Sequence, residues 1–187
     1  MDQETKSTLK IAIVGPESTG KSTLSEQLAT HYKTVFVREY AREYLEQLDR
    51  PYTQDDLTAI AQGQIQLENN ALQSANRLLF CDTNLMVIII WSEYKYGSIA
   101  PEITQLHNYQ HYDLYLLANN DTTWEYDPLR EAPNIEERNR IYDIYVRYCN
   151  QSGVPYRIVS GTGADRLTNA INAVEEFLKW VLGKNRE

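Results

Sequence analysis

Short apolar runs alternate with longer amphipathic stretches along the whole chain. This alternation is typical of a parallel β-sheet whose strands are joined by helices that cover its faces. The runs are almost continuously apolar, which predicts strands buried on both sides. The predicted strands are residues 10–14, 34–38, 78–82, 114–118 and 156–160. Together they predict a three-layer α/β fold with a five-stranded parallel sheet.

Three amphipathic stretches carry signals that begin or end a helix. Thr53 is followed three residues later by Asp56, a pairing that caps a helix start, and Asn134 begins a second helix in a similar way. The stretch 163–182 repeats apolar residues in steps of three and four, which places them on one helix face. Gly183 follows it and predicts its end.

A polar stretch at residues 119–133 breaks this pattern. It contains two prolines and follows the fourth predicted strand. A long connection without regular structure is uncommon in a compact domain unless it has a function. We therefore predict a mobile lid loop at about residues 119–137. No repeat or linker divides the chain, so the sequence predicts one domain over residues 1–187.

The composition narrows the expected partners and location. The chain has 187 residues, is 42% hydrophobic and carries a formal net charge of -8, which argues against nucleic acid and anionic membranes as partners. The ten N-terminal residues are polar, and the longest apolar run, 85–91, is far shorter than the roughly 20 residues that span a bilayer. Two cysteines cannot make a disulfide framework. We expect a cytoplasmic protein that binds a small molecule, and the oligomeric state stays open, a homo-oligomer included.

Residues 15–22 read Gly-Pro-Glu-Ser-Thr-Gly-Lys-Ser and match the phosphate-loop pattern GxxxxGK[ST], or Walker A motif, at every fixed position. The glycines let successive N–H groups point at phosphate oxygens, and the helix start expected after the loop adds its positive dipole end. Lys21 is expected at the β/γ-phosphates of ATP and Ser22 at Mg²⁺. The predicted nucleotide-binding residues are Gly15, Glu17, Ser18, Thr19, Gly20, Lys21, Ser22 and Thr23.

Glu17 is an unusual member of this set, because a carboxylate near a triphosphate is electrostatically unfavourable. It either turns outward toward the acceptor substrate or a cation, or is a solvated loop residue. The sequence is compatible with each of these alternatives.

The third predicted strand ends in Asp82, the position expected for a second metal-binding element. Asp82 either holds Mg²⁺ through water or accepts a proton from an attacking hydroxyl. A guanine-reading NKxD motif is missing after the fourth strand, where residues 119–122 read Asn-Asn-Asp-Thr, so a GTPase is disfavoured. A motor or AAA-type ATPase would usually need a longer chain. A small acceptor kinase fits the size.

Charged residues follow the second predicted strand, at the sheet edge where ligands bind in α/β folds. Glu39 and Glu43, like Arg38 and Arg42, are four residues apart, and like charges at this spacing destabilise a helix. We therefore assign them chemistry. Glu39 is expected to act as the base or to bind a sugar hydroxyl, and Arg42 to orient it. Whether Glu39 or Asp82 is the base stays open.

The predicted lid carries its own candidates. Arg130 is expected to stabilise charge that develops on the transferred phosphoryl group. Trp124 has little core around it in a polar loop and is expected to cover a ligand ring. Trp91 lies in an apolar stretch and is read as a core residue rather than a ligand contact.

These segments resemble a known family. They are GPESTGKST at 15–23, REYAR at 38–42, CDT at 81–83, WSEY at 91–94, YDLYLL at 112–117 and WEYDPLRE at 124–131. The chain resembles the ribosylnicotinamide kinase domain of NadR-type NAD-salvage proteins, a phosphate-loop, AAA-like kinase family. The resemblance covers nearly the whole chain and implies a P-loop kinase fold with a lid.

The resemblance implies ATP-dependent phosphorylation of the 5′-hydroxyl of nicotinamide riboside, with Mg²⁺, to give nicotinamide mononucleotide. In that family aromatic residues hold the nicotinamide ring, a role that maps onto Trp124 and a nearby tyrosine, for which Tyr40 is the candidate. A pyridinium cation favours a Trp face. Asp127 and Glu39 would add negative charge or hydrogen bonds to the sugar.

Two departures from the family qualify this expectation. No HxGH-type adenylyltransferase site occurs in the sequence, so a standalone kinase form is expected. Asn84 stands where some relatives have an acidic residue, which leaves Asp82 as the one sure carboxylate at that strand end. The alternatives are a kinase for another nucleoside and a regulatory ATP-binding module. The residues that contact adenine stay open, with the turn at 160–163 as the candidate.

Overall fold

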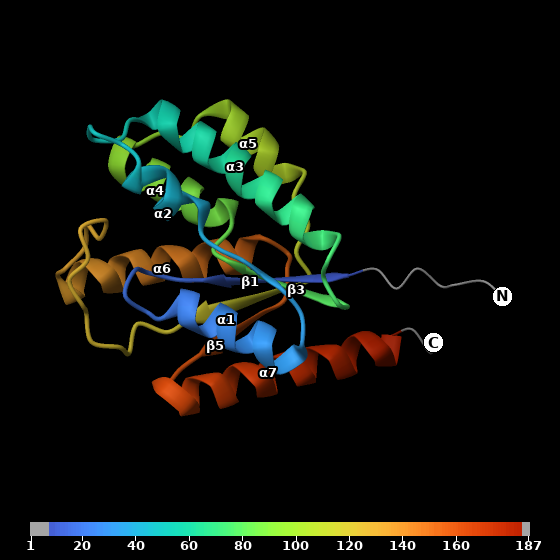
Figure 1. Ribbon diagram of the computed structural model, residues 1–187. Helices are drawn as coiled ribbons and strands as arrows, with labels where there is room; N and C mark the ends of the chain where they lie inside the picture. The colour runs from blue at the N-terminus through green and yellow to red at the C-terminus, as the bar shows by residue number, and fades with distance from the viewer. Residues whose placement is uncertain (1–7, 185–187) are drawn as a thin grey trace.

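A single parallel sheet forms the centre of the molecule in the computed structural model, which describes residues 8–184 (Figure 1). Its strands run in the order β2-β3-β1-β4-β5, and every pairing is parallel. Their bounds are β1 Leu9–Val14, β2 Phe36–Val37, β3 Leu78–Asp82, β4 Leu114–Ala118 and β5 Tyr156–Val159. Because all strands are parallel, their carboxyl ends meet at one edge.

The strand side chains alternate between two apolar layers, as the two-residue period of a strand requires. On β1, Ile11 and Ile13 face a cluster formed with α1 (Lys21–Tyr32) and α7 (Gly163–Lys184). Ala12 and Val14 face the opposite cluster, formed mainly with α4 (Leu85–Tyr96) and α6 (Ile135–Gln151). The sheet is therefore covered on both faces, which confirms the three-layer α/β fold.

A further group of helices lies above one face of the sheet (Figure 1). It consists of α2 (Tyr40–Glu46), α3 (Gln54–Leu72), α5 (Pro101–Asn108) and the outer side of α4, and it has its own apolar cluster. Leu57, Ile60 and Ala61 of α3 pack there against Ile88, Ile89 and Ile103. This layer forms one wall of the candidate site.

Most predicted elements occur where they were expected, and the exceptions have physical causes. Strand 34–38 is reduced to Phe36–Val37, and strand 156–160 ends at Val159. Burial of every strand on both faces was a wrong prediction for β5, because it is an edge strand and exposes Arg157 and Ile158. The last helix continues through Gly183 to Lys184, since glycine weakens a helix but does not have to end it.

The helix starts behave as predicted. Thr53 and Asp56 form a reciprocal capping box at α3, and the Asn134 side chain accepts the Glu136 N–H at α6. Residues 119–134 contain neither helix nor strand, so only the last three residues of the predicted lid are helical. No helix among residues 8–184 is long and apolar enough to cross a membrane. Residues 1–7, on which part of the expectation about the N-terminus depends, lie outside the described residues.

A buried ion pair lies near the amino-terminal ends of the strands. Lys10 Nζ lies 2.7 Å from Glu68 Oε2, and the Glu68 side chain is fully buried. Tyr112 donates its hydroxyl to both Glu68 oxygens at 2.9 Å, and Gln64 Nε2 lies 3.3 Å from Oε1. This network joins β1 to α3 and satisfies a charge that would otherwise be costly to bury.

We predict that Lys10→Met lowers the free energy of unfolding by about 3–5 kcal/mol, because it leaves the Glu68 charge buried without its cation. Urea denaturation followed by circular dichroism measures this loss. As a control, Arg157→Met removes an exposed pair whose atoms are 3.9 Å apart, and should cost about 1 kcal/mol or less. Equal losses in the two variants would contradict the assignment.

Candidate functional site

The loop between β1 and α1 has the geometry of a phosphate cradle. Gly15 has φ +140, and a Cβ there would lie 2.8 Å from the Ala118 carbonyl oxygen of β4, so no other residue fits. Thr19 is fully buried and donates Oγ1 to the Pro16 carbonyl at 2.8 Å, which holds the loop from inside. Lys21 is the first residue of α1, so the loop leads directly into a helix N-terminus.

Lys21, Ser22 and Asp82 lie near one another. Lys21 Nζ donates to the Pro16 carbonyl at 2.8 Å, which keeps the ammonium over the loop. Asp82 is 2% exposed, and its Oδ1 is buried without a hydrogen-bond partner. Burial raises the pKa of Asp82, while Lys21 and a hydrogen bond from Ser22 lower it.

These residues fit a magnesium ion. An unpartnered, buried carboxylate oxygen beside a serine hydroxyl offers hard oxygen ligands. Mg²⁺ is commonly bound through one or two protein ligands together with substrate phosphates and water. No cluster of three or more His, Cys, Asp or Glu side chains suited to a metal occurs in residues 8–184, so the remaining ligands would come from the nucleotide and water.

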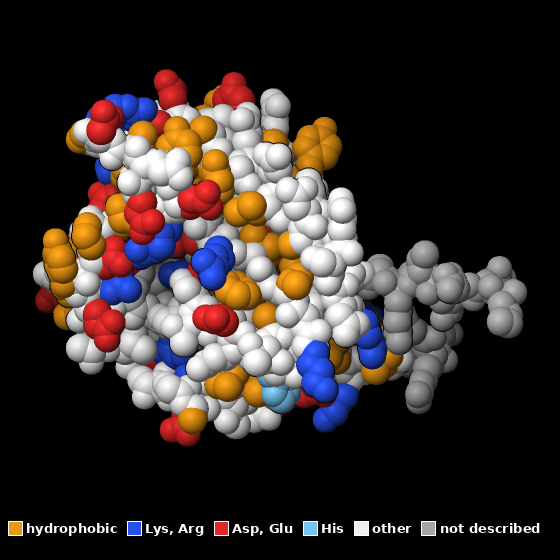
Figure 2. Space-filling model, viewed as in Figure 1, with side chains coloured by type: hydrophobic (Ala, Val, Ile, Leu, Met, Phe, Trp, Pro, Cys, Tyr) orange, Lys and Arg blue, Asp and Glu red, His pale blue; other side chains and the backbone are white. Residues whose placement is uncertain are grey.

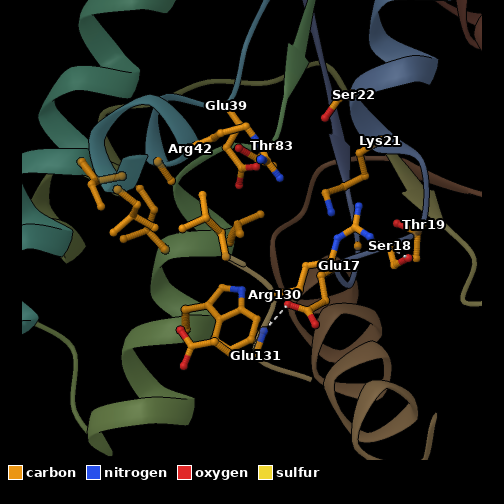
Figure 3. A pocket seen from close by; sticks show the side chains of 18 of the residues that line it. Glu17, Ser18, Thr19, Lys21, Ser22, Glu39, Arg42, Thr83, Arg130 and Glu131 are labelled. Carbon is orange, nitrogen blue, oxygen red and sulfur yellow. Dashed lines mark hydrogen bonds between the residues drawn. The ribbon is translucent and has the colours of Figure 1, made fainter. Parts of the chain in front are cut away.

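Glu39 lies directly before α2 and faces the same space from the other side (Figure 3). Its pKa is raised from 4.5 to about 6, chiefly by burial, with Asp82 and Asp127 adding to the effect and Lys21 and Arg42 opposing it. Glu39 therefore lines the cavity with Lys21, and Asp82 lies near enough for its charge to act on Glu39. A carboxyl group with this pKa is suited to accept a proton near neutral pH.

Two contacts fix the start of α2 and with it Glu39. The Tyr40 N–H donates to Gln64 Oε1 of α3 at 2.9 Å. The Tyr40 ring covers Gly63, where a Cβ would come within 2.0 Å of the ring. Gln64 in turn contacts the buried Glu68, so the network at the amino edge extends to the site. Tyr40 is a packing residue in this structure and does not line the cavity.

Arg42 joins α2 to the lid. Its Nη2 lies 2.7 Å from Asp127 Oδ2, and Nη1 lies 3.4 Å from Glu46 Oε1. The pKa of Asp127 is lowered, chiefly by the hydrogen bond from the Leu129 N–H and next by the hydrogen bond from Arg42. Arg42 lines the cavity and Asp127 does not, so the two residues predicted to contact substrate are engaged with each other at its edge.

The lid returns to the phosphate loop. Arg130 Nη1 lies 3.3 Å from Ser18 Oγ and also donates to the Glu125 carbonyl. Glu17 accepts hydrogen bonds from the lid, which is none of the alternatives considered for it from the sequence.

Lys, Arg, Asp and Glu side chains surround a hollow on this face of the molecule (Figure 2).

A cavity of about 240 Å³ connects these groups. One end is formed by the phosphate loop, Glu39, Arg42 and Arg130, and the other by apolar and aromatic side chains of α2, α3 and α4 (Figure 3). Trp91 lines it and Trp124 does not. The structure thus places Trp91, which we expected in the core, at the cavity, and Trp124, which we expected over a ligand ring, outside its lining. Trp124 lies on the lid with Nε1 3.4 Å from Glu17 Oε1, whereas one face of α4 turns Trp91 toward the cavity.

Several lining residues were missed from the sequence. They are Tyr52, Gln64, Tyr145 and Glu131. A signal existed for Gln64, because it continues the helical spacing of Leu57, Ile60 and Ala61 and is a polar residue on an apolar face. The other three carry no local signal, since only the packing of α4, α6 and the lid brings them to the cavity.

Arg166 is a second omission. It is 4% exposed and donates to the Gly161 carbonyl at 2.6 Å, to the Asn119 carbonyl at 3.1 Å, and to Thr19 O and Asp121 Oδ1. It ties the phosphate loop to the ends of β4 and β5. A second hollow, of about 430 Å³, opens beside it and includes Thr162 and Gly163 of the turn that we considered for adenine.

Comparison with known proteins agrees with this geometry. A family model described as an AAA domain, AAA_28, matches residues 10–166. The trifunctional NAD biosynthesis/regulator proteins NadR of Salmonella typhimurium and Escherichia coli are each 27% identical over 175 residues, which is 90% of this chain and 42% of theirs. The chain therefore spans less than half the length of these curated relatives.

Solved structures show the same fold. The NadR protein in complex with NR has a TM-score of 0.76 and 24% identity, over 91% of this chain and 51% of that chain. Thymidylate kinase from Ehrlichia chaffeensis has a TM-score of 0.63 and 16% identity, over 90% and 97%. The resemblance to the NadR kinase domain and the P-loop kinase fold are both confirmed. The match to an AAA domain model shows that chain length alone does not exclude this class.

We predict that Glu39→Gln stabilises the protein most at high pH. The folded-state pKa of Glu39, about 6, exceeds its ordinary value of 4.5. The protonated form therefore favours the folded state, and the free energy of unfolding falls as pH rises from 4.5 through 6. The loss is on the order of 1–2 kcal/mol. Glutamine removes it. The advantage of the variant should be largest above pH 7 and shrink toward pH 4.5.

Thermal unfolding in buffer with EDTA measures this difference without metal at the neighbouring Asp82. Glu26→Gln, an exposed site on α1, is the control and should show no such trend. An advantage of Glu39→Gln that is the same at pH 5 and pH 8 would contradict the burial argument.

Proposed function

The chain belongs to the AAA_28 family of AAA domains, and from this premise and its nucleoside-kinase-like fold we propose that it is an ATP-dependent kinase for nicotinamide riboside. The product would be nicotinamide mononucleotide. The observation that carries the proposal is one continuous cavity that joins the phosphate loop and Glu39 to an acceptor chamber, which is the apolar end lined by Trp91 and Tyr52. NadR, which matches at low identity and over part of its length, supports the choice of acceptor.

The donor half has the parts that phosphoryl transfer needs. Backbone N–H groups of the loop, Lys21 and the start of α1 would hold the phosphates of ATP. The hollow beside Thr162 and Arg166 would take the nucleoside part of ATP. Mg²⁺, held by Ser22 and Asp82, would neutralise charge on the phosphate oxygens.

The acceptor half suits a flat cation. Trp91 and Tyr52 form aromatic walls, and Glu131 lines the cavity beside them. Lys95 already occupies a face of the Tyr52 ring and pairs with Glu131, since its Nζ lies 3.6 Å from the ring centre and 3.0 Å from Glu131 Oε2. A pyridinium ring over an indole face gains about 0.5–2 kcal/mol. Trp91 is therefore the wall that we propose for the charged ring of nicotinamide riboside.

Glu39 is the proposed base. Its carboxylate would take the proton of the 5′-hydroxyl while that oxygen bonds to the γ-phosphorus of ATP and the bond to the leaving oxygen of ADP breaks. The pKa of about 6 leaves Glu39 mostly ionised at neutral pH and close enough to it for proton transfer. Asp82 is assigned to the metal because it lies beside Ser22 and keeps one buried oxygen without a hydrogen-bond partner. Arg130 would stabilise negative charge on the transferred group.

A kinase for another nucleoside is the second candidate. The likeness to deoxyadenosine kinase from M. mycoides favours it, since the match has a TM-score of 0.57 and covers 90% of this chain and 100% of that chain. A neutral base would gain less from aromatic walls beside a carboxylate than a pyridinium ring does. A regulatory ATP-binding module would not need an acceptor chamber.

The first test is phosphorylation of a nucleoside panel by the purified chain with ATP and Mg²⁺, followed by a coupled ADP assay and product mass. Nicotinamide riboside should give at least a tenfold higher kcat/KM than uridine, thymidine or deoxyadenosine. Lys21→Ala should lower turnover by about a hundredfold or more, because one electrostatic contact at the transition state is worth about 2.7–4 kcal/mol. A higher kcat/KM for another nucleoside would show that nicotinamide riboside is not the preferred acceptor. No turnover with any nucleoside of the panel would refute the kinase proposal.

A second test concerns the aromatic wall. Trp91→Leu should raise KM for nicotinamide riboside about twofold to thirtyfold, equivalent to roughly 0.5–2 kcal/mol, with little change in KM for ATP. Trp124→Leu is a comparison on the lid, outside the cavity lining, and should not raise the acceptor KM to the same extent. If only Trp124→Leu raises it, the original assignment of the ring to Trp124 is correct.

A further inference from the structure

Two side chains of the phosphate loop are used for contacts with the lid. Glu17 Oε1 accepts the Ala132 N–H at 2.7 Å, and Oε2 accepts the Glu131 N–H at 3.0 Å. Trp124 Nε1 also lies 3.4 Å from Oε1. Figure 3 shows Glu17 directed at the segment that carries Arg130 and Glu131. A carboxylate that accepts several N–H groups makes charge-assisted hydrogen bonds, which are about twice as strong as neutral ones.

The neighbouring Ser18 holds the other stem of the lid. Its Oγ accepts the Glu125 N–H at 2.9 Å, and its carbonyl accepts the Thr122 hydroxyl at 2.6 Å. Ser18 has φ 60, a left-handed conformation that is uncommon outside glycine. The lid is thus attached at both ends to consecutive residues of the phosphate loop, and Glu17 supplies the charged attachment.

We propose that Glu17 is a positioning residue, which docks the lid on the phosphate loop and so sets Arg130 for phosphoryl transfer; this rests on the proposed kinase function. Arg130 is the residue directly before one of the N–H donors, so the hydrogen bond to Glu131 fixes the backbone that carries the guanidinium. Its Nη1 already lies 3.3 Å from Ser18 Oγ. The lid donors also compensate the Glu17 charge, which explains how a carboxylate is tolerated in a loop for phosphates.

The role predicts a particular kinetic defect. Glu17→Gln keeps the size of the side chain but replaces one acceptor oxygen with an NH₂ donor, which faces an N–H whichever way the amide is turned. We expect kcat to fall about tenfold to a hundredfold, because small misplacement of a catalytic group has a cost of this order. KM for ATP should change less than about threefold, and the melting temperature should match that of Glu26→Gln.

A double-mutant cycle with Arg130→Ala separates positioning from a direct role. If Glu17 acts through Arg130, Glu17→Gln should lower kcat less than about twofold further in the Arg130→Ala background. A full additional loss would show that Glu17 acts independently and would overturn the proposal. So would an unchanged kcat in Glu17→Gln alone, or a loss of ATP affinity that accounts for the whole defect.

Trp124 provides a readout that does not need catalysis. With Trp91 and Trp180 replaced by phenylalanine, Trp124 is the remaining tryptophan of the chain. In this background Glu17→Gln should increase acrylamide quenching of Trp124 fluorescence at least twofold, since the lid loses its attachment. Increased quenching, together with no phosphorylation of any nucleoside by the unsubstituted protein, would leave the docking intact and refute the kinase function. Unchanged quenching would refute the docking itself.

Discussion

The parallel pairing of β1 between β3 and β4 is the constraint on which the site depends. The register sets Ile13 opposite Asp82 and Val14 opposite Leu117, so the loop after β1 leaves the sheet beside the carboxylate of β3 and the end of β4. The approach to β4 is so close that Gly15 has no room for a Cβ. Because every strand ends at the same edge, this arrangement brings together Lys21, Asp82, Glu39 and the lid.

Charge is concentrated at this edge and is balanced locally. Glu39 and Asp82 lie near Lys21 and Arg42, which lower the pKa of both carboxyl groups and so offset part of the cost of burying them. Glu17 is balanced by backbone donors of the lid. Arg166 is balanced by the Asp121 carboxylate and by carbonyls of three different segments. An overall acidic chain can therefore accept a polyphosphate, because the interaction is made by a focused cradle rather than by a basic surface.

Patterns that act over a few residues made most of the fold predictable. The phosphate loop, the strand that ends in Asp82 and the capping box at Thr53 each depend on near neighbours, and the structure has all three. Predictions that depended on the three-dimensional surroundings of a residue were less accurate. The edge position of β5 exposes residues that the pattern treated as buried. Trp91 lines the cavity although we expected it in the core, because polarity along the chain cannot reveal which face a helix presents to a cavity.

By itself, the sequence determined the α/β class, the phosphate cradle with Lys21 and Ser22, and the candidates Glu39, Asp82 and Arg130, because each is encoded by local spacing and residue chemistry. The tertiary structure decided what these residues touch. The packing of α2 on Gly63 and Gln64 sets Glu39, the turn of α4 brings Trp91 to the chamber, and the return of the lid gives Glu17 its partners. Such contacts join residues as much as 115 positions apart, so no local pattern encodes them.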